Sequence, residues 1–184
     1  GTVMDRSRTP LAKWAAAIRL LATSNGINAV QLAKAIGVSH KNAWTMLRSI
    51  RRAISALDAT QTLSGTVRAG LLFLGRRNLQ PFMFHPQEHS IIIGATVEPD
   101  TDEPVVLKLR TVPRKHLTDF KRLTRQGEAT FFAQHVDPGA CDVLMLKRVQ
   151  MPRHNPIRQR FDEMAHWLNG LFHGLGKKYL QTYL

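Results

Sequence analysis

The chain has 184 residues, 43% of them hydrophobic, so it can bury a core and is not a disordered tail. Its 26 Lys and Arg residues outnumber 13 acidic residues and give a formal charge of +13, which favours a polyanionic partner such as nucleic acid. A single cysteine, Cys141, excludes an internal disulfide and any zinc site built from several cysteines, and we expect it to be a small buried side chain.

The beginning of the chain lacks the pattern of a signal peptide, and no stretch approaches the roughly 20 apolar residues of a membrane span. We therefore expect a cytoplasmic, nucleoid-associated protein. Gly1 to Val3 resemble a remnant of cloning, so we expect the native start at Met4.

The first predicted helix follows Thr9 and Pro10, which suit a cap and a first helical position, and Asn25-Gly26 ends it. Its apolar residues recur at helical steps and predict one buried face, made of Leu11, Trp14, Ala15, Ile18, Leu21 and Ala22.

Residues 27–54 have the pattern of a helix-turn-helix. Asn28 can cap a short helix with Leu32, Ala33 and Ile36 on one face, and Gly37 supplies the backbone freedom for an abrupt turn. Ser39 can cap the next helix, whose predicted buried stripe is Ala43, Leu47, Ile50 and Ile54.

The remaining positions of this second helix carry residue types that contact phosphates and base edges. We predict that Lys41, Asn42, Thr45 and His40 contact bases in the major groove and that Ser39, Arg48, Arg51 and Arg52 contact phosphates. Acidic residues are sparse in this part of the chain, as in DNA-binding domains.

Residues 58–62 are polar and small and are the predicted linker. Beyond them the pattern predicts strands at 63–75, 90–98 and 104–113, a helix at 114–126 with Leu117, Phe120, Leu123 and Thr124 at helical steps, and strands at 129–133 and 142–149. A last helix is predicted at 156–172. The predicted class is α+β, with a trihelical helix-turn-helix domain at 4–57 and a domain at 63–184 whose element order is that of an RNase H-like mixed sheet covered by helices.

The residues that carry a family resemblance are TPLAKW, LLATSNGINAVQLAKAIGVSHKNAW, LSGTV and HWLNGLFHGLGKKYLQTYL. With them the chain resembles bacterial insertion-sequence transposases of the ISXO type. The resemblance implies an RNase H-like core that holds two divalent metal ions between acidic side chains.

The positions of those acids are altered here. The resemblance places the first at Gly70 and the second at Ala133, and it leaves Glu163 as one acid in the third position. One carboxylate binds magnesium weakly, so we expect no catalytic residue, metal site or cofactor, and an inactive, domesticated relative.

Other groups of residues favour no second site. We expect Asp100, Asp102 and Glu103 to form a solvated turn rather than a cation site, and the histidines lack the paired spacing of a zinc site. Core packing is the expected role of the tryptophans, with base stacking kept open for Trp44. Two groups of cations in the second part of the chain fit an extended DNA path or an ordinary solvated surface equally well: Arg76 and Arg77, and the run Lys147, Arg148, Arg153, Arg158 and Arg160.

The sequence thus predicts a protein that binds specific sites in double-stranded DNA, a transcriptional regulator or chromosome-associated factor without transposase activity. We expect a homodimer, with the RNase H-like domain available for dimerisation or for another regulatory protein. The alternatives are a residually active metal-dependent transposase or nuclease that uses Glu163 with Asp137 or Asp142, and a protein-interaction module whose basic head is incidental.

Overall fold

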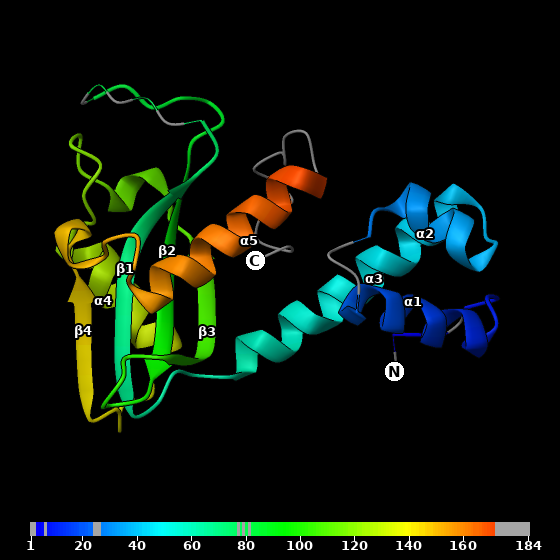
Figure 1. Cartoon of the computed structure of the whole chain (residues 1–184), viewed down its shortest axis with the longest axis horizontal. Helices are drawn as coiled ribbons and strands as arrows, with labels where there is room; N and C mark the ends of the chain where they lie inside the picture. Colours follow the sequence, from blue (N-terminus) through cyan, green and yellow to red (C-terminus); the bar gives the residue numbers. More distant parts are fainter. Residues whose placement is uncertain are drawn as a thin grey trace. The chain divides into compact units, whose positions relative to one another are not determined.

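The computed structural model describes residues 3–5, 7–23, 27–76, 78, 80 and 82–171. The chain divides into two compact units, residues 1–60 and residues 61–184. Three helices make up the first unit, and a four-stranded sheet with helices makes up the second (Figure 1). The predicted α+β class is confirmed.

The first unit contains helices α1 (Leu11–Thr23), α2 (Ala29–Ile36) and α3 (His40–Thr60). All three were predicted, and they share one hydrophobic core formed by Trp14, Ala17, Ile27, Leu32, Ala43, Met46, Leu47 and Ile50. The predicted face of α1 is wrong in large part: Ala17 is buried, whereas four residues of the predicted face, Leu11, Ala15, Ile18 and Ala22, are exposed.

Helix α3 is longer than the sequence indicated. It continues to Thr60, so three residues of the predicted linker are helical. Ile54, predicted to be buried, is 54% exposed because it lies beyond the part of α3 that packs on α1 and α2. Met46 is buried although it was not part of the buried stripe predicted for this helix.

The sheet has the strand order β3-β2-β1-β4. Strands β1 (Thr66–Leu74), β2 (His89–Val97) and β3 (Pro104–Thr111) form an antiparallel meander, and β4 (Asp142–Leu146) returns to pair parallel with β1. The three strands of the meander and β4 were predicted. Pairing β4 parallel to β1 requires a crossover connection, which residues 112–141 supply.

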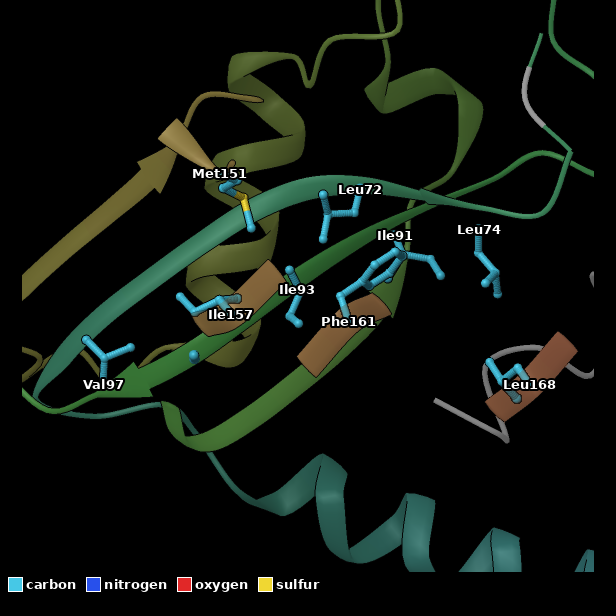
Figure 2. Close-up of a cluster of buried hydrophobic side chains, with 10 residues drawn as sticks. Leu72, Leu74, Ile91, Ile93, Val97, Met151, Ile157, Phe161 and Leu168 are labelled. Carbon is cyan, nitrogen blue, oxygen red and sulfur yellow. The ribbon is translucent and has the colours of Figure 1, made fainter. Parts of the chain in front are cut away.

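Side chains alternate between the two faces of the sheet because successive residues of a strand point to opposite sides. On one face, Leu72, Leu74, Ile91 and Ile93 pack against Ile157, Phe161 and Leu168 of α5 (Pro156–Leu171), as Figure 2 shows. On the other face, Val67, Ala69 and Ile92 pack against Phe131 of α4 (Arg125–His135). Each face therefore has its own helix.

The predictions for residues 114–133 were wrong. A short 3-10 helix, η1 (Arg114–His116), is followed by a turn, and α4 begins only at Arg125. The Thr124 hydroxyl caps α4 by accepting from Gly127 N at 3.1 Å, so Gly127, which directly follows the predicted helix at 114–126, lies in the first turn of α4. The run predicted as a strand at 129–133 is helical, because Phe131 packs into the core from α4.

A buried ion pair joins this turn to the connection between β1 and β2. Lys121 Nζ lies 2.8 Å from Glu88 Oε2, and both side chains are almost fully buried. Glu88 Oε2 also accepts from the backbone N–H groups of Asn78 and His85. Burial alone would raise the pKa of the Glu88 carboxyl, but these hydrogen bonds and the Lys121 charge outweigh it and hold the pKa below its ordinary value.

Cys141 is exposed, not buried, because it lies in the short loop before β4. Among the helices that the structure describes, none combines the length and the apolar character needed to cross a membrane.

Candidate nucleic-acid interface

The two helices α2 and α3 are joined by a tight turn whose geometry is fixed by side-chain caps. Asn28 Oδ1 accepts from Gln31 N at 2.9 Å, and Gln31 Oε1 accepts from Asn28 N at 3.0 Å, which completes a capping box at the start of α2. Gly37 ends α2 in the left-handed conformation, with a φ of 62°. Ser39 Oγ then accepts from Asn42 N and caps α3.

Helix α1 also secures this turn. Lys13 Nζ donates to the Gly37 carbonyl oxygen at 2.6 Å. The charged group thereby satisfies a carbonyl that the end of α2 leaves without a helical partner. All three helices of the first unit therefore contribute to the direction in which α3 leaves the turn.

The first half of α3 buries one side and exposes the other. Ala43, Met46, Leu47 and Ile50 are buried in the core. The opposite side is a stripe spaced i, i+3, i+4, i+7 and i+11, positions that lie on one face of a helix. We call it the α3 stripe; it consists of Lys41, Trp44, Thr45, Arg48 and Arg52, all of them exposed.

Within the α3 stripe, the guanidinium of Arg48 lies over the ring of Trp44, with Cζ 5.3 Å from the ring centroid. Trp44 is nevertheless 46% exposed, whereas the core residue Trp14 is 3% exposed. Thr45 Oγ1 donates to the Lys41 carbonyl at 2.9 Å, which orients its methyl group and leaves the hydroxyl oxygen as an acceptor. The stripe therefore combines cations, an aromatic ring and a hydroxyl group.

The structure divides the predicted contact residues into two groups. Four of them, Lys41, Thr45, Arg48 and Arg52, share the α3 stripe. Ser39, His40 and Asn42 are exposed at the start of α3 but lie off the stripe, and Arg51, seven residues after Trp44, borders the stripe and is half-buried. Trp44 was kept open for base stacking but was not among the predicted contact residues; its place three residues after Lys41 and four before Arg48 was the signal that it shares their face.

Charge in the first unit is strongly biased. Residues 1–60 contain nine Lys or Arg residues and two acidic residues, Asp5 and Asp58. Neither acid lies on the α3 stripe. A surface of this kind attracts polyanions and raises their rate of association.

The second unit contains the positions that the transposase resemblance assigns to catalytic acids. Gly70 lies in β1 on the α5 side of the sheet, where the side chain of Met151 fills the space that a Cβ at this position would need. Ala133 is exposed on α4, which covers the opposite face. Side chains at these two positions are separated by the sheet and could not bind one metal ion together.

The other acidic residues that the sequence offered as possible metal ligands make contacts of their own. Glu163 is exposed on α5 and lies 3.2 Å from Arg160 Nη1. Asp142 and Asp102 both contact Arg68, at 2.7 Å and 3.6 Å, and Asp137 accepts from Gly139 N in a turn. Asp100, Asp102 and Glu103, which were expected to form a turn, lie between β2 and β3 and are exposed.

In the part of the chain that the structure describes, no three His, Cys, Asp or Glu side chains gather where they could hold a metal ion. Asp142 begins β4 opposite Thr66, whereas Gly70 pairs with Leu146 at the other end of this strand. Four residues of a strand span about 13 Å. Asp142 is therefore too far away to replace a ligand at Gly70.

No protein-family model, curated protein or solved structure matches this chain.

Proposed function

We propose that this chain is a sequence-specific DNA-binding protein whose first unit is a helix-turn-helix domain. The observation that carries the proposal is the α3 stripe, an exposed face directly after the turn in which Gly37 ends α2 and Ser39 caps α3. Its residues are Lys41, Trp44, Thr45, Arg48 and Arg52. An α-helix fits the major groove, where Lys and Arg pair with guanine and where an apolar group contacts the thymine methyl.

In this proposal, α3 enters the major groove and the start of the helix faces the bases. Lys41 and Thr45 contact base edges, together with His40 and Asn42 at the first turn of α3. Arg48, Arg51 and Arg52 follow along the helix and contact phosphates, as does Ser39 at the cap. Trp44 lies between the two groups, and its ring packs on sugars or on a thymine methyl.

The second unit is, in this proposal, an RNase H-like domain without transposase activity. Its strand order β3-β2-β1-β4, with an antiparallel meander and β4 parallel to β1, supports the assignment, which otherwise rests on analogy. Gly70 in place of an acid and Met151 beside it support the loss of two-metal chemistry. Such a domain serves dimerisation or the binding of another protein, and the whole chain acts as a transcriptional regulator or chromosome-associated factor in the nucleoid.

The test is selection of bound duplexes from a random DNA library, followed by sequencing, with the full chain. The wild type is expected to enrich a discrete motif, and Lys41→Ala/Arg48→Ala is expected to lose it. Arg19→Gln, which removes an exposed charge from α1, is the matched control and is expected to keep the motif. Wild-type protein that enriches no motif, or a motif that survives the double substitution, would contradict the proposal.

Chromatin immunoprecipitation with the same variants tests the proposal in cells. Discrete peaks that disappear in Lys41→Ala/Arg48→Ala are expected for a regulator that recognises its sites through α3. The absence of discrete peaks in the wild type would instead favour a protein-interaction module.

A further inference from the structure

Two phenylalanine rings are exposed side by side on the second unit, far from the α3 stripe in the sequence. Phe82, in the connection between β1 and β2, and Phe120, in the turn before α4, have ring centroids 5.0 Å apart and an interplanar angle of 58°. The two side chains are 60% and 62% exposed, and Met83 beside them is 55% exposed. We call these three residues the aromatic tip.

The backbone beneath the aromatic tip is held in an uncommon conformation. Phe82 and Lys121 both have positive φ, 66° and 58°, which bulky non-glycine residues seldom adopt. Residues 118–122 form a tight turn, in which Lys121 N donates to the Thr118 carbonyl and Thr118 N donates to the Arg122 carbonyl. Strained backbone of this kind persists only where the surroundings enforce it, and it is concentrated at functional sites.

Contacts between the two segments hold the backbone of Phe82 and Lys121 in this conformation. Phe82 N donates to the Asp119 carbonyl at 3.0 Å and joins the two segments through their backbones. Directly below, the buried pair of Lys121 and Glu88 joins them again, and Phe84 lies under Arg114 with the guanidinium 3.9 Å from its ring centroid. The backbone that carries the two exposed rings is therefore fixed in advance, which lowers the entropic cost of binding a ligand.

The segment that carries Phe120 is basic, which favours an anionic ligand. Residues 113–125 contain five cations and one acid, Asp119, which pairs with Arg114 at 2.9 Å. Lys115, Arg122 and Arg125 are exposed. Rings that offer their faces beside cations fit a chain of alternating flat bases and phosphates, and stacking of bases on aromatic side chains tolerates any sequence.

We propose that the aromatic tip binds unpaired nucleotides of a nucleic-acid strand, stacking bases on Phe82 and Phe120 while Lys115 and Arg122 contact phosphates. Unpaired bases have free faces that can stack on aromatic rings, whereas the bases of a duplex are already stacked on one another. This activity goes beyond the proposed recognition of duplex DNA, and it uses residues of the other unit. Neither activity depends on the other.

The test is fluorescence anisotropy of a labelled oligothymidylate of about 15 nucleotides, a length within the range that single-strand binding sites cover, titrated with the full chain. Phe82→Ala/Phe120→Ala is expected to raise Kd by about tenfold or more, since each stacked base contributes substantially. Leu57→Ala, which truncates a side chain that is 66% exposed on α3, is the matched control and is expected to leave Kd unchanged. Phe82→Tyr/Phe120→Tyr keeps both rings and is expected to retain binding.

Two further measurements separate single-strand binding from duplex recognition and from membrane binding. Lys41→Ala/Arg48→Ala is expected to weaken binding to a selected duplex while leaving oligothymidylate binding intact, so either activity can fail alone. Vesicles of phosphatidylserine and phosphatidylcholine test an anionic membrane surface as the ligand.

Unchanged oligothymidylate affinity in Phe82→Ala/Phe120→Ala, or vesicle binding that this substitution abolishes while oligothymidylate binding persists, would overturn the proposal. If circular dichroism shows that the double alanine variant is unfolded, the single variants Phe82→Ala and Phe120→Ala replace it. Unchanged oligothymidylate affinity in both single variants, or loss of binding in folded Phe82→Tyr/Phe120→Tyr, would then overturn the proposal.

Discussion

The side chain of Met151 occupies the space that any side chain at Gly70 would require. The methionine is 2% exposed, and it packs in the same hydrophobic cluster as Leu72 and Leu74, which follow Gly70 on the same face of β1. The position at which the transposase resemblance places the first metal ligand is therefore part of an apolar core. A carboxylate there would be buried beside a thioether and far from a second acid.

Gly70→Ala tests this packing. The added methyl group is expected to lower the free energy of unfolding by about 1 kcal/mol, at the low end of the range for overpacking because methionine is flexible. Met151→Ala removes a buried side chain and is expected to cost about 2 to 5 kcal/mol. In the double variant the new methyl group fills part of the cavity, so its cost in urea denaturation is expected to be below the sum of the single costs. Additive costs would show that the two residues do not compete for space.

The pair of Glu88 and Lys121 predicts a dependence of stability on pH. The folded-state pKa of Glu88 is depressed, so its contribution is present above the ordinary pKa of 4.5 and is lost as the pH falls through the folded-state value. Urea denaturation of the wild type is expected to show falling stability below about pH 4.5. Glu88→Gln, which is close in shape but does not titrate, is expected to be less stable at pH 7 by about 3 kcal/mol, as for one broken partner of a buried pair. Glu88→Gln is also expected to reduce the fall in the free energy of unfolding at acidic pH. A fall identical to that of the wild type would contradict this role for Glu88.

Local signals predicted most of the elements. The capping residues Asn28 and Ser39, the left-handed Gly37 and the β-branched runs of β1, β2 and β3 each act within a few residues of themselves, so the sequence was sufficient to locate them. In the first half of α3, the exposed residues other than Trp44 followed from helical spacing. Trp44 was left open between core and surface, because a tryptophan at the edge of an apolar stripe fits both, and tertiary contacts decide which occurs.

Residues 114–133 could not be predicted in the same way. Leu117, Phe120 and Leu123 have helical spacing, but Lys121 takes a left-handed conformation to reach Glu88, a residue 33 positions earlier in the chain. The apolar residues of α4 have the pattern of a short strand, and the packing of Phe131 beside Gly94 and the cap at Thr124 favour the helix. Both errors involve partners distant in sequence. The aromatic tip was missed for the same reason, since Phe82 and Phe120 meet only in the folded chain.

The capping box of α2 is expected to contribute to the stability of the first unit. Asn28→Ala removes the acceptor for Gln31 N and is expected to lower the free energy of unfolding by about 1 kcal/mol. Asn28→Asp keeps a side-chain oxygen at the cap and places a negative charge at the helix start, so it is expected to match or exceed the wild type. Thermal denaturation followed by circular dichroism measures both. Equal stability of the alanine and aspartate variants would show that the cap contributes nothing.

The salt dependence of duplex binding measures how many phosphates the protein contacts. Each phosphate contact contributes about one unit to the slope of log Kd against log salt concentration. Arg48→Gln is expected to weaken binding to a selected duplex and to reduce this slope by about one, because the side chain neutralises a phosphate. Arg19→Gln removes the same charge from α1 and is expected to leave the slope unchanged. Equal slopes for the wild type and Arg48→Gln would remove Arg48 from the phosphate contacts.

DNA cleavage decides between a DNA-binding role and residual nuclease chemistry. Supercoiled plasmid incubated with the full chain and either magnesium or manganese is expected to remain intact, because Gly70 and Ala133 supply no ligands and lie on opposite sides of the sheet. Glu163, exposed and paired with Arg160, cannot hold a catalytic ion alone. The matched variant Glu163→Ala separates contamination from intrinsic activity: nicking that persists in this variant comes from another source or from other residues. Metal-dependent nicking by the wild type that disappears in Glu163→Ala would refute the inactive assignment and identify Glu163 as a ligand.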